Sequence, residues 1–579
     1  MIKQLQKLMK KNHIDYYIVP TSDEHQSEII GDFYQFRRYL TGFTGSNGTL
    51  LVSRKNAYLW TDGRYFLQAS KQLGEDVTLM RMSMPGVPTL IEFLAEHMKE
   101  DDVLGFDGTT MSPATILQLV DSLDFDLQYE EIDLSIMWVD RPERSHEPVY
   151  LYDNIYHGRD VADKLEELRD FMTVNHCDHH LISTLDDIAW LFNLRGNDIP
   201  DSPTALAFAI ISQDQASLYL QEGTYSHYIE NHYQEVNVTI KDYDDVYEDT
   251  ALLEGVLLVD TKAINMALYD AINCDIIDEA NPTQYFKCIK NDVEIKNTKN
   301  AHLKDGIAMT KFMYYLKNND LKGEDEITIA NKLLSYRQQQ PLFVEPSFST
   351  ICAYGSNAAI IHYEATPDNF SPVDNSHMLM IDSGGQYLDG TTDITRTFVL
   401  GDITEEEKHG FTLVLKGFLR LQNAIFNDAT YSDALDFIAR EPLAKEHLDY
   451  RHSTGHGVGH FLNVHENPVS ITMRHPFAIR FEPGMITSDE PGLYVDGEYG
   501  IRHENELLCV EAKTNEYGRF LTFEPLTLCP IDLEGVDVTM LTDKEKQWLN
   551  DYHQLIYTSL KDHLTDEERV WLKFATRSI

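Results

Sequence analysis

The chain has 579 residues, a length that allows about three or four domains. Hydrophobic residues make up 42% and charged residues 25%, which is the composition of a globular protein and excludes collagen, coiled coil and extensive disorder. With 94 acidic and 48 basic residues the net charge is −46, so we do not expect the protein to bind nucleic acid.

The cysteines and the N-terminus bear on the cellular compartment. The six cysteines form no Cys-x-x-Cys pair, which favours reduced structural thiols over a disulfide framework. Residues 1–11 have amphipathic helical spacing and lack the apolar segment of a signal peptide. No apolar run nears the roughly 18 residues that a membrane span needs. We therefore expect a soluble cytoplasmic protein without a membrane partner.

The N-terminal region alternates helical and strand patterns, which is typical of an α/β domain. It predicts, in order, a helix over 2–12, a strand over 15–20, a Gly-rich loop over 41–48, strands over 49–53 and 57–60, and a helix over 64–73.

A polar, Pro-containing stretch over 138–148 is interpreted as a linker, and the same kind of pattern follows it. The second region predicts helices over 160–174 and 185–193, a turn over 196–203, and strands over 180–184, 205–211, 216–220 and 255–260. The two regions look like duplicated folds without duplicated sequence.

A long helix beginning at Asn291 opens a third, larger region, and Thr542 with Glu545 forms a capping-box pattern before helices that reach about residue 573. We expect domains over 1–140, 141–290 and 291–579, the last with a C-terminal extension from about residue 535.

Four segments of the third region hold clustered acidic and histidine residues. Over 378–400, an apolar strand leads to Asp382, a Gly-rich turn follows, and a second strand carries Asp393. Because the two aspartates are about equally far from the turn, an antiparallel hairpin is expected to bring them opposite each other. Two such carboxylates repel each other and are costly to desolvate, which a cation would relieve, although solvated turn positions are an alternative.

The segment 451–468 places His452, His456, His460 and His465 among glycines and apolar residues that favour burial. Further on, Glu490 precedes a proline and is therefore biased to an extended conformation. The segment 500–510 alternates as a strand, on which Arg502 and Glu504 share a face.

Together these segments indicate an oxygen-rich site with histidine and without thiolates, which excludes a Cys-rich structural zinc site. Mn, Mg, Fe, Co or Zn would fit such donors. Four carboxylates carry too much charge for one divalent ion but suit two, and a pair of ions can activate a bridging water.

The chain resembles the long, three-domain cytosolic Xaa-Pro aminopeptidases (aminopeptidase P) of the pita-bread metallopeptidases. The resemblance rests on these site segments and on the segments 23–28, 61–68, 138–143, 189–198, 346–348 and 354–363. It implies two creatinase-N-like α/β domains, then a pita-bread catalytic domain with a C-terminal helical extension. It also implies a homodimer and a hydrolase that removes the N-terminal residue of peptides with proline second.

By similarity, two divalent ions, most often Mn²⁺ in relatives and with Co²⁺, Fe²⁺ or Zn²⁺ as alternatives, would be held by Asp382, Asp393, His456, Glu490 and Glu504. Asp393 and Glu504 would bridge both ions. The resemblance gives catalytic roles to His362, His452, His465 and Glu490 and substrate contacts to Arg64, His362, His465, Tyr494 and Arg502. Glu490 would move a proton from the activated water to the leaving nitrogen.

Two residues depart from the family pattern: His503 stands where relatives have an aliphatic residue, and His460 where they have a small one. Strand alternation puts His503 opposite Glu504, so we do not expect it to be a ligand, and we expect His460 to pack rather than to line the pocket. A prolidase, acting on Xaa-Pro dipeptides, and a metal-free protein-binding module are the alternatives. Missing ligand positions would mark the latter, and none of the five is missing.

Overall fold

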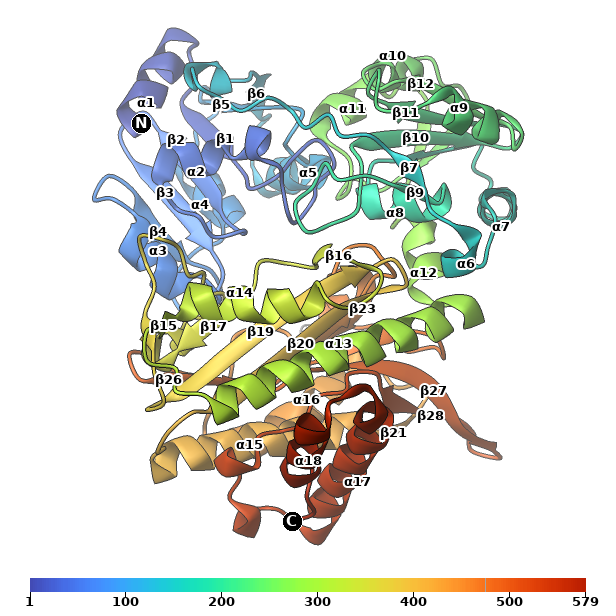
Figure 1. Cartoon of the computed structure of the whole chain (residues 1–579). Coiled ribbons are helices and arrows are strands. Elements are labelled where there is room, and N and C mark those ends of the chain that lie inside the picture. Colours follow the sequence, from blue (N-terminus) through green and yellow to red (C-terminus); the bar gives the residue numbers. More distant parts are fainter. Residues whose placement is uncertain (474) are drawn as a thin grey trace. The chain divides into compact units, whose positions relative to one another are not determined.

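The computed structural model describes residues 1–473 and 475–579, which form two compact units. The first unit comprises Met1–Asp153 and Arg159–Thr283, and the second comprises Asn154–Gly158 and Gln284–Ile579 (Figure 1). No helix among the described residues is long and apolar enough to cross a membrane. The cysteines of the sequence are present as free thiols.

The first unit begins with a mixed sheet in the order β4-β3-β2-β1-β5-β6. Apolar side chains from both of its faces are buried against helices α1 to α5 and form two clusters. The elements are α1 Ile2–Lys11, β1 Tyr16–Val19, α2 Phe36–Thr41, β2 Thr49–Ser53, β3 Ala57–Thr61, α3 Phe66–Gln72, β4 Thr78–Arg81, α4 Leu90–His97, β5 Val103–Phe106, α5 Pro113–Ser122 and β6 Gln128–Glu131.

A second sheet in the order β12-β11-β10-β8-β13-β14 repeats this topology. In both sheets the first strand pairs antiparallel with the strand that follows it in that sheet's sequence order and parallel with the strand on its other side. The fold is therefore duplicated, as the sequence predicts. The elements are β7 Tyr150–Leu151, α7 Val161–Val174, β8 His179–Ile182, α8 Leu185–Leu191, β9 Leu194–Arg195, β10 Ala207–Ser212, β11 Ala216–Leu220, α9 His227–Gln234, β12 Val238–Asp242, α10 Asp245–Ala251, β13 Val256–Val259, α11 Met266–Ala271 and β14 Asp275–Asp278.

The stretch predicted to be a linker lacks helix and strand over 139–149 but is held in place. The Arg141 guanidinium lies 3.5 Å from the centre of the Phe33 ring, and the Ser145 hydroxyl donates to Asp198 at 2.6 Å. A cation–π contact and hydrogen bonds of this kind restrict the backbone. This connection is therefore pinned to the two α/β domains that it joins.

The second unit is built around the hairpin of β19 (Met378–Tyr387) and β20 (Gly390–Val399), whose residues are buried throughout. Period-two alternation separates its faces. Leu379, Ile381 and Phe398 pack against the long helix α13 (Asp292–Asn318). Burying one such side chain contributes about 1.5–3 kcal/mol. The opposite face carries Asp382 and Asp393, so the packing of α13 fixes which way the aspartates point.

The hairpin register corrects one prediction. Asp382 pairs with Thr395, and Asp393 pairs with Gly384, so the two aspartates are diagonal neighbours rather than direct partners. The turn between Tyr387 and Gly390 lies nearer to Asp393 than the Gly-rich sequence suggests. Diagonal residues on one face are still within side-chain reach, so the carboxylates share one site.

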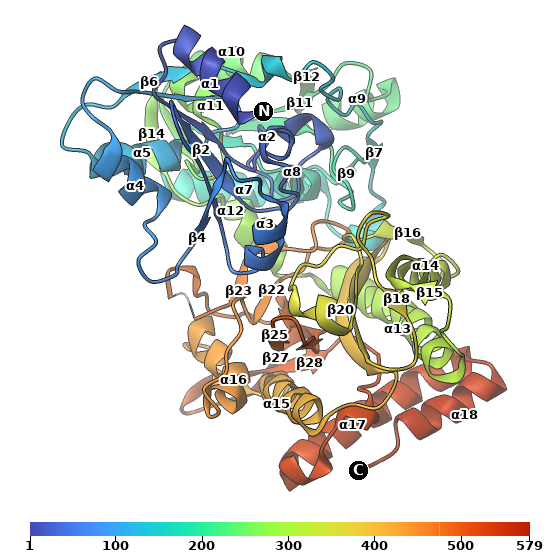
Figure 2. The same cartoon turned by 90° about the vertical axis from the view of Figure 1, so that its left-hand side faces the viewer.

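Another sheet, in the order β21-β28-β27-β24-β22-β23, and the ribbon of β25 with β26 complete the second unit's strands around the hairpin. Helices α17 and α18 lie side by side near the C-terminus and join the core through Leu549, Ile556 and Leu572 (Figures 1 and 2). The capping box of Thr542 and Glu545 begins α17. These elements give the pita-bread region and its helical extension.

The remaining elements are α6 Asn154–His157, α12 Pro282–Cys288, β15 Glu324–Asp325, α14 Glu326–Arg337, β16 Phe343–Pro346, β17 Ile351–Tyr354, β18 Pro372–Val373, α15 Glu405–Gln422, β21 Ile425–Asn427, α16 Ser432–Ala444, β22 Gly455–Gly457, β23 Glu466–Ile471, β24 Ile486–Asp489, β25 Gly492–Val495, β26 Tyr499–Arg502, β27 Asn505–Asn515, β28 Gly518–Pro525, α17 Asp543–Leu560 and α18 Asp566–Ala575.

Candidate metal centre

The acidic residues of the hairpin meet a histidine and two glutamates from the neighbouring sheet. His456 lies on β22, Glu490 directly follows β24, and Glu504 lies between β26 and β27. The Nε2 atom of His456 is 3.4 Å from Asp393 Oδ2 and 3.5 Å from Glu490 Oε1. One donor atom each from Asp393, His456 and Glu504 lies within 4.8 Å of the others.

Glycines allow β22 to approach its neighbours closely. A Cβ atom on Gly455 would lie 2.1 Å from the carbonyl oxygen of Ser488, and one on Gly457 would lie 2.3 Å from that of Glu466. Because backbone atoms cannot move aside as a flexible side chain can, only glycine fits at these positions. The Gly-His-Gly sequence thus brings His456 up to β24, where the Ser488 hydroxyl accepts its backbone N–H at 3.0 Å.

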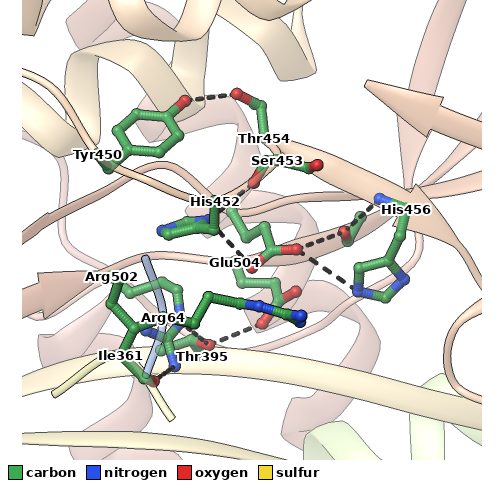
Figure 3. Close-up of polar contacts among 12 residues, drawn as sticks. Arg64, Ile361, Thr395, Tyr450, His452, Ser453, Thr454, His456, Arg502 and Glu504 are labelled. Carbon is green, nitrogen blue, oxygen red and sulfur yellow. Dashed lines mark hydrogen bonds and ion pairs between the residues drawn. The ribbon is translucent and has the colours of Figure 1, made fainter. Parts of the chain in front are cut away.

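The strand predicted over 500–510 is interrupted at His503 and Glu504. This interruption orients the Glu504 side chain toward the site. The backbone N–H of Glu504 donates to Thr395 O at 3.0 Å, and Thr395 Oγ1 donates to Glu504 Oε2 at 2.7 Å. Arg502 also donates to Thr395 Oγ1, at 3.1 Å. Arg502 and Glu504 therefore meet at this hydroxyl, as Figure 3 shows.

A chain of hydrogen bonds runs from Asp382 to His452. The buried Arg502 guanidinium donates to Asp382 Oδ2 at 2.5 Å and to the Tyr494 hydroxyl at 2.7 Å. That hydroxyl lies 2.9 Å from His452 Nε2, while His452 Nδ1 lies 2.7 Å from the Ser453 carbonyl oxygen. Because a carbonyl can only accept, these partners assign the proton to Nδ1 and make Nε2 the acceptor of the Tyr494 O–H.

The electrostatics of the cluster are dominated by burial and mutual repulsion. Burial, together with the charges of Asp393 and Glu490, raises the pKa of Glu504 well above its usual value. Burial raises the pKa of Glu490 to about 7, against the lowering effect of His456. Burial would lower the pKa of His456, but the hydrogen bond to Asp393 and the charge of Glu490 raise it to about 10. The cluster therefore holds excess negative charge that draws in protons.

The donor set fits divalent metal ions. Asp382 is 8% and Asp393 4% exposed, and the Oδ1 atom of each has no hydrogen-bond partner among the described residues. Buried carboxylate oxygens are costly unless they are paired or coordinate a cation. Four carboxylates and one imidazole match the oxygen-rich preference of Mn²⁺ and related ions. The cationic Arg502 offsets part of this charge only.

The structure places the predicted substrate residues as follows. The His465 ring lies edge-on to His456, with ring centres 4.3 Å apart. His362 follows Ile361, whose carbonyl oxygen is 3.5 Å from Arg502 Nη2. Arg64 belongs to the first unit, where its guanidinium donates to both carboxylate oxygens of Asp62, each at 2.9 Å. Its role in substrate binding stays a prediction.

The two histidines that depart from the family pattern lie away from this cluster. The His460 ring nitrogens are 3.0 Å from the Thr298 hydroxyl and 3.0 Å from the Tyr156 carbonyl oxygen. The His503 ring packs edge-on against Phe411 at 4.3 Å, and burial lowers its pKa to about 3. Both side chains are buried in the fold of the second unit.

Sequence reasoning missed supporting residues around the carboxylates. Thr395 lies two residues after Asp393, so period-two alternation alone could have found it. Glu506 accepts the Asp393 backbone N–H at 2.6 Å and is 3.1 Å from His302 Nε2 on α13. Glu506 is two residues beyond Glu504 and carries the same signal, whereas nothing in the helix sequence marks His302.

Comparisons with known proteins agree with this architecture. Residues 1–136 and 140–294 each match a creatinase/prolidase N-terminal domain, 296–511 match metallopeptidase family M24, and 519–579 match the C-terminal region of peptidase M24.

Full-length relatives and one solved structure are also similar. A probable Xaa-Pro aminopeptidase P of Botryotinia fuckeliana is 40% identical over 98% of this chain and 91% of that protein. Aminopeptidase P2 of Arabidopsis thaliana is 38% identical over 96% of this chain and 85% of that protein. The crystal structure of X-prolyl aminopeptidase from Caenorhabditis elegans, described as a cytosolic enzyme with a di-nuclear active site, is 33% identical with a TM-score of 0.93, covering 98% of this chain and 95% of that one. The chain belongs to metallopeptidase family M24, within its group of Xaa-Pro aminopeptidases P.

Proposed function

We propose that this hydrolase removes the N-terminal residue of peptides whose second residue is proline. The observation that carries the proposal is the convergence of Asp393, His456 and Glu504 on one buried point in the second unit. Full-length similarity to proteins named Xaa-Pro aminopeptidase supports the substrate class.

We propose that two divalent metal ions would be held by Asp382, Asp393, His456, Glu490 and Glu504. When bound, two divalent ions supply Lewis-acid chemistry that polarises the scissile carbonyl and lowers the pKa of water. We propose Mn²⁺ as the metal because relatives most often use it, with Co²⁺, Fe²⁺ and Zn²⁺ as alternatives. The unpartnered oxygens of the two aspartates support this ligand set.

The chain's own groups would move the proton and hold the substrate. Glu490 would accept a proton from water and pass it to the leaving nitrogen of proline. His362 and His465 would donate to the oxygen of the tetrahedral intermediate. The hydrogen bonds from Arg502 through Tyr494 would fix the orientation of the His452 ring, for which we propose a catalytic role.

Proline as the second residue sets a physical requirement. The Xaa-Pro bond is a tertiary amide without an N–H, and the ring fixes φ, so the enzyme must accept the ring and protonate an imino nitrogen. A prolidase would also need a cation for the free carboxylate of a dipeptide. Arg502 is committed to Asp382 and Tyr494, which argues against that use. We propose that Arg64 contacts longer peptides.

We further propose a cytoplasmic homodimer, a placement that rests on relatives. The cytosolic description of the C. elegans enzyme supports the compartment. The net charge of −46 argues against a nucleic acid partner. Sedimentation of the purified protein tests the oligomeric state, and a monomer at micromolar concentration contradicts it.

Steady-state kinetics on matched peptides tests the proposed activity. Xaa-Pro-Xaa tripeptides, the matching Xaa-Pro dipeptides and Xaa-Ala-Xaa tripeptides are compared in one buffer. We expect the highest kcat/KM for the proline tripeptides and a larger loss from replacing proline than from changing the far end. A dipeptide that proves the best substrate would favour the prolidase function instead.

A further inference from the structure

Helix α16 holds a buried ion pair beside the segment that leads into β22. Arg440 is 4% and Asp436 1% exposed, and they lie one helical turn apart. The segment over 449–454, here termed the 449–454 loop, connects α16 to the strand that carries His456 and includes His452. We find the contacts of this ion pair concentrated on that loop.

Each of the five N–H donors of Arg440 has an acceptor. Within α16, Nε donates to Asp436 Oδ2 at 2.6 Å and Nη2 to Asp436 Oδ1 at 3.3 Å. The others reach the 449–454 loop: Nη1 donates to Asp449 Oδ1 and to Tyr450 O, each at 2.8 Å, and Nη2 donates to His452 O at 2.7 Å. A guanidinium has five donors in a rigid fork, so this arrangement fixes three loop residues at once.

The loop also binds back to Asp436. Thr454 Oγ1 donates to Asp436 Oδ1 at 2.6 Å and accepts from the Tyr450 hydroxyl at 2.5 Å, a contact visible in Figure 3. The Arg440 guanidinium stacks 3.8 Å from the centre of the Tyr450 ring. We call this set of Asp436, Arg440, Tyr450 and Thr454 the arginine clasp.

Two residues of the proposed active site, His452 and Glu490, are held through the 449–454 loop. The His452 backbone is held through its carbonyl by Arg440, while its ring is held by Tyr494. The Thr454 carbonyl accepts the backbone N–H of Glu490 at 2.8 Å. The arginine clasp thus holds the His452 backbone by hydrogen bonds, and Tyr494, which is itself bonded to Arg502, holds the His452 ring.

We infer that Arg440 and Asp436 are positioning residues that hold His452 at the angle catalysis needs. This inference rests on the proposed function, because it assigns His452 a part in that reaction. A buried Arg–Asp pair adds little stability, because the cost of desolvating the two charges offsets their attraction. Apolar residues in the same positions often stabilise a fold equally well. The Arg440 guanidinium instead donates directional hydrogen bonds to three residues of the loop.

The first test compares Arg440→Gln and Arg440→Lys with wild type on a Xaa-Pro-Xaa tripeptide. A misplacement near 1 Å can cost about 100-fold, so we expect kcat to fall about 10- to 100-fold in Arg440→Gln, with bound metal unchanged and KM altered far less. Arg440→Lys keeps the charge without the fork and should recover little of the loss.

The control variant is Arg420→Gln on α15. Arg420 also bridges carboxylates, donating to Glu545 at 2.8 Å and to Glu441, but it touches neither the 449–454 loop nor a proposed site residue in its hydrogen bonds among described residues. We expect a similar loss of thermal stability with kcat unchanged. An equal fall of kcat in Arg420→Gln would overturn the inference, because general destabilisation would then explain both variants.

A double-mutant cycle and a crystal structure separate this inference from the proposed function. If Arg440 acts through His452, Arg440→Gln with His452→Ala should be no slower than His452→Ala alone, whereas independent roles give multiplied losses. The crystal structure of Arg440→Gln should show the His452–Tyr494 hydrogen bond broken. If that bond survives, the clasp has no positioning role, whatever the substrate proves to be. If the bond breaks but no Xaa-Pro peptide is cleaved by wild type, only the proposed function fails.

Discussion

Replacing Glu504 by glutamine should stabilise the metal-free protein while it destroys the metal site. Donor atoms of Asp393 and Glu504 lie within 4.8 Å of each other, which for two unit charges at an effective dielectric of 20 gives a repulsion of about 3.5 kcal/mol. The glutamine oxygen can still accept the Thr395 hydroxyl. Because the metal-free cluster relieves part of the repulsion by taking up protons, we expect a net gain of about 1–3 kcal/mol in Glu504→Gln.

Scanning calorimetry after exhaustive chelation measures this difference, with metal loss confirmed by elemental analysis. For a unit of this size, the gain corresponds to a rise in Tm of about 2–6 °C. The control is Glu524→Gln, an exposed residue paired with Lys299, for which we expect less than about 0.5 kcal/mol. With Mn²⁺ added, the order should reverse, because only wild type gains binding energy.

A metal-free Glu504→Gln protein that is no more stable than metal-free wild type would refute this reasoning. It would mean that the carboxylates are already compensated by groups of the protein. The central physical argument for a cation in the cluster would then be lost.

Three further predictions concern the same site. His362→Ala and His465→Ala should each lower kcat by about 10²–10³ while bound metal stays stoichiometric, since an oxyanion donor is lost; metal loss in either would make that histidine a ligand. Because the pKa of the metal-free His456 is about 10 and that of Glu504 is well above its usual value, metal must displace protons from both. Calorimetric titrations should therefore show metal affinity rising at least about tenfold per pH unit from about pH 7 to 9; an affinity independent of pH would contradict this. Thr395→Val removes the hydroxyl that holds Glu504 and should weaken metal binding about 10- to 100-fold; unchanged affinity measured by competition with a chelator would show that the hydroxyl is dispensable.

The elements of the fold could be predicted because their signals are local. Strand periodicity predicts the hairpin of β19 and β20, and helical periodicity and the capping box predict where α13 and α17 begin. The duplicated α/β topology was visible for the same reason. The exact pairing of Asp382 was not, because a shift of the turn by one residue moves every partner and the Gly-rich sequence permits several turns.

The sequence indicates candidate site residues but not the contacts that hold them in place. Carboxylates at strand ends and a Gly-flanked histidine are visible in sequence. The contacts that orient them join distant segments: Arg396, for instance, donates to the Glu504 carbonyl at 2.5 Å and to the Tyr552 hydroxyl of α17 at 2.9 Å. Such bonds depend on tertiary packing, so the clasp on α16 and the contribution of the C-terminal extension emerged only from the structure. The domain boundaries proposed at 140 and 290 stay a prediction.

Metal add-back during catalysis tests the central claim most directly. The chelated protein, verified to be metal-free, is titrated with Mn²⁺ while hydrolysis of a Xaa-Pro-Xaa tripeptide and bound metal are measured in the same samples. We predict no cleavage without metal and full activity when two ions are bound per chain. Full activity in the verified metal-free protein, or metal binding that restores no Xaa-Pro cleavage, would contradict the account.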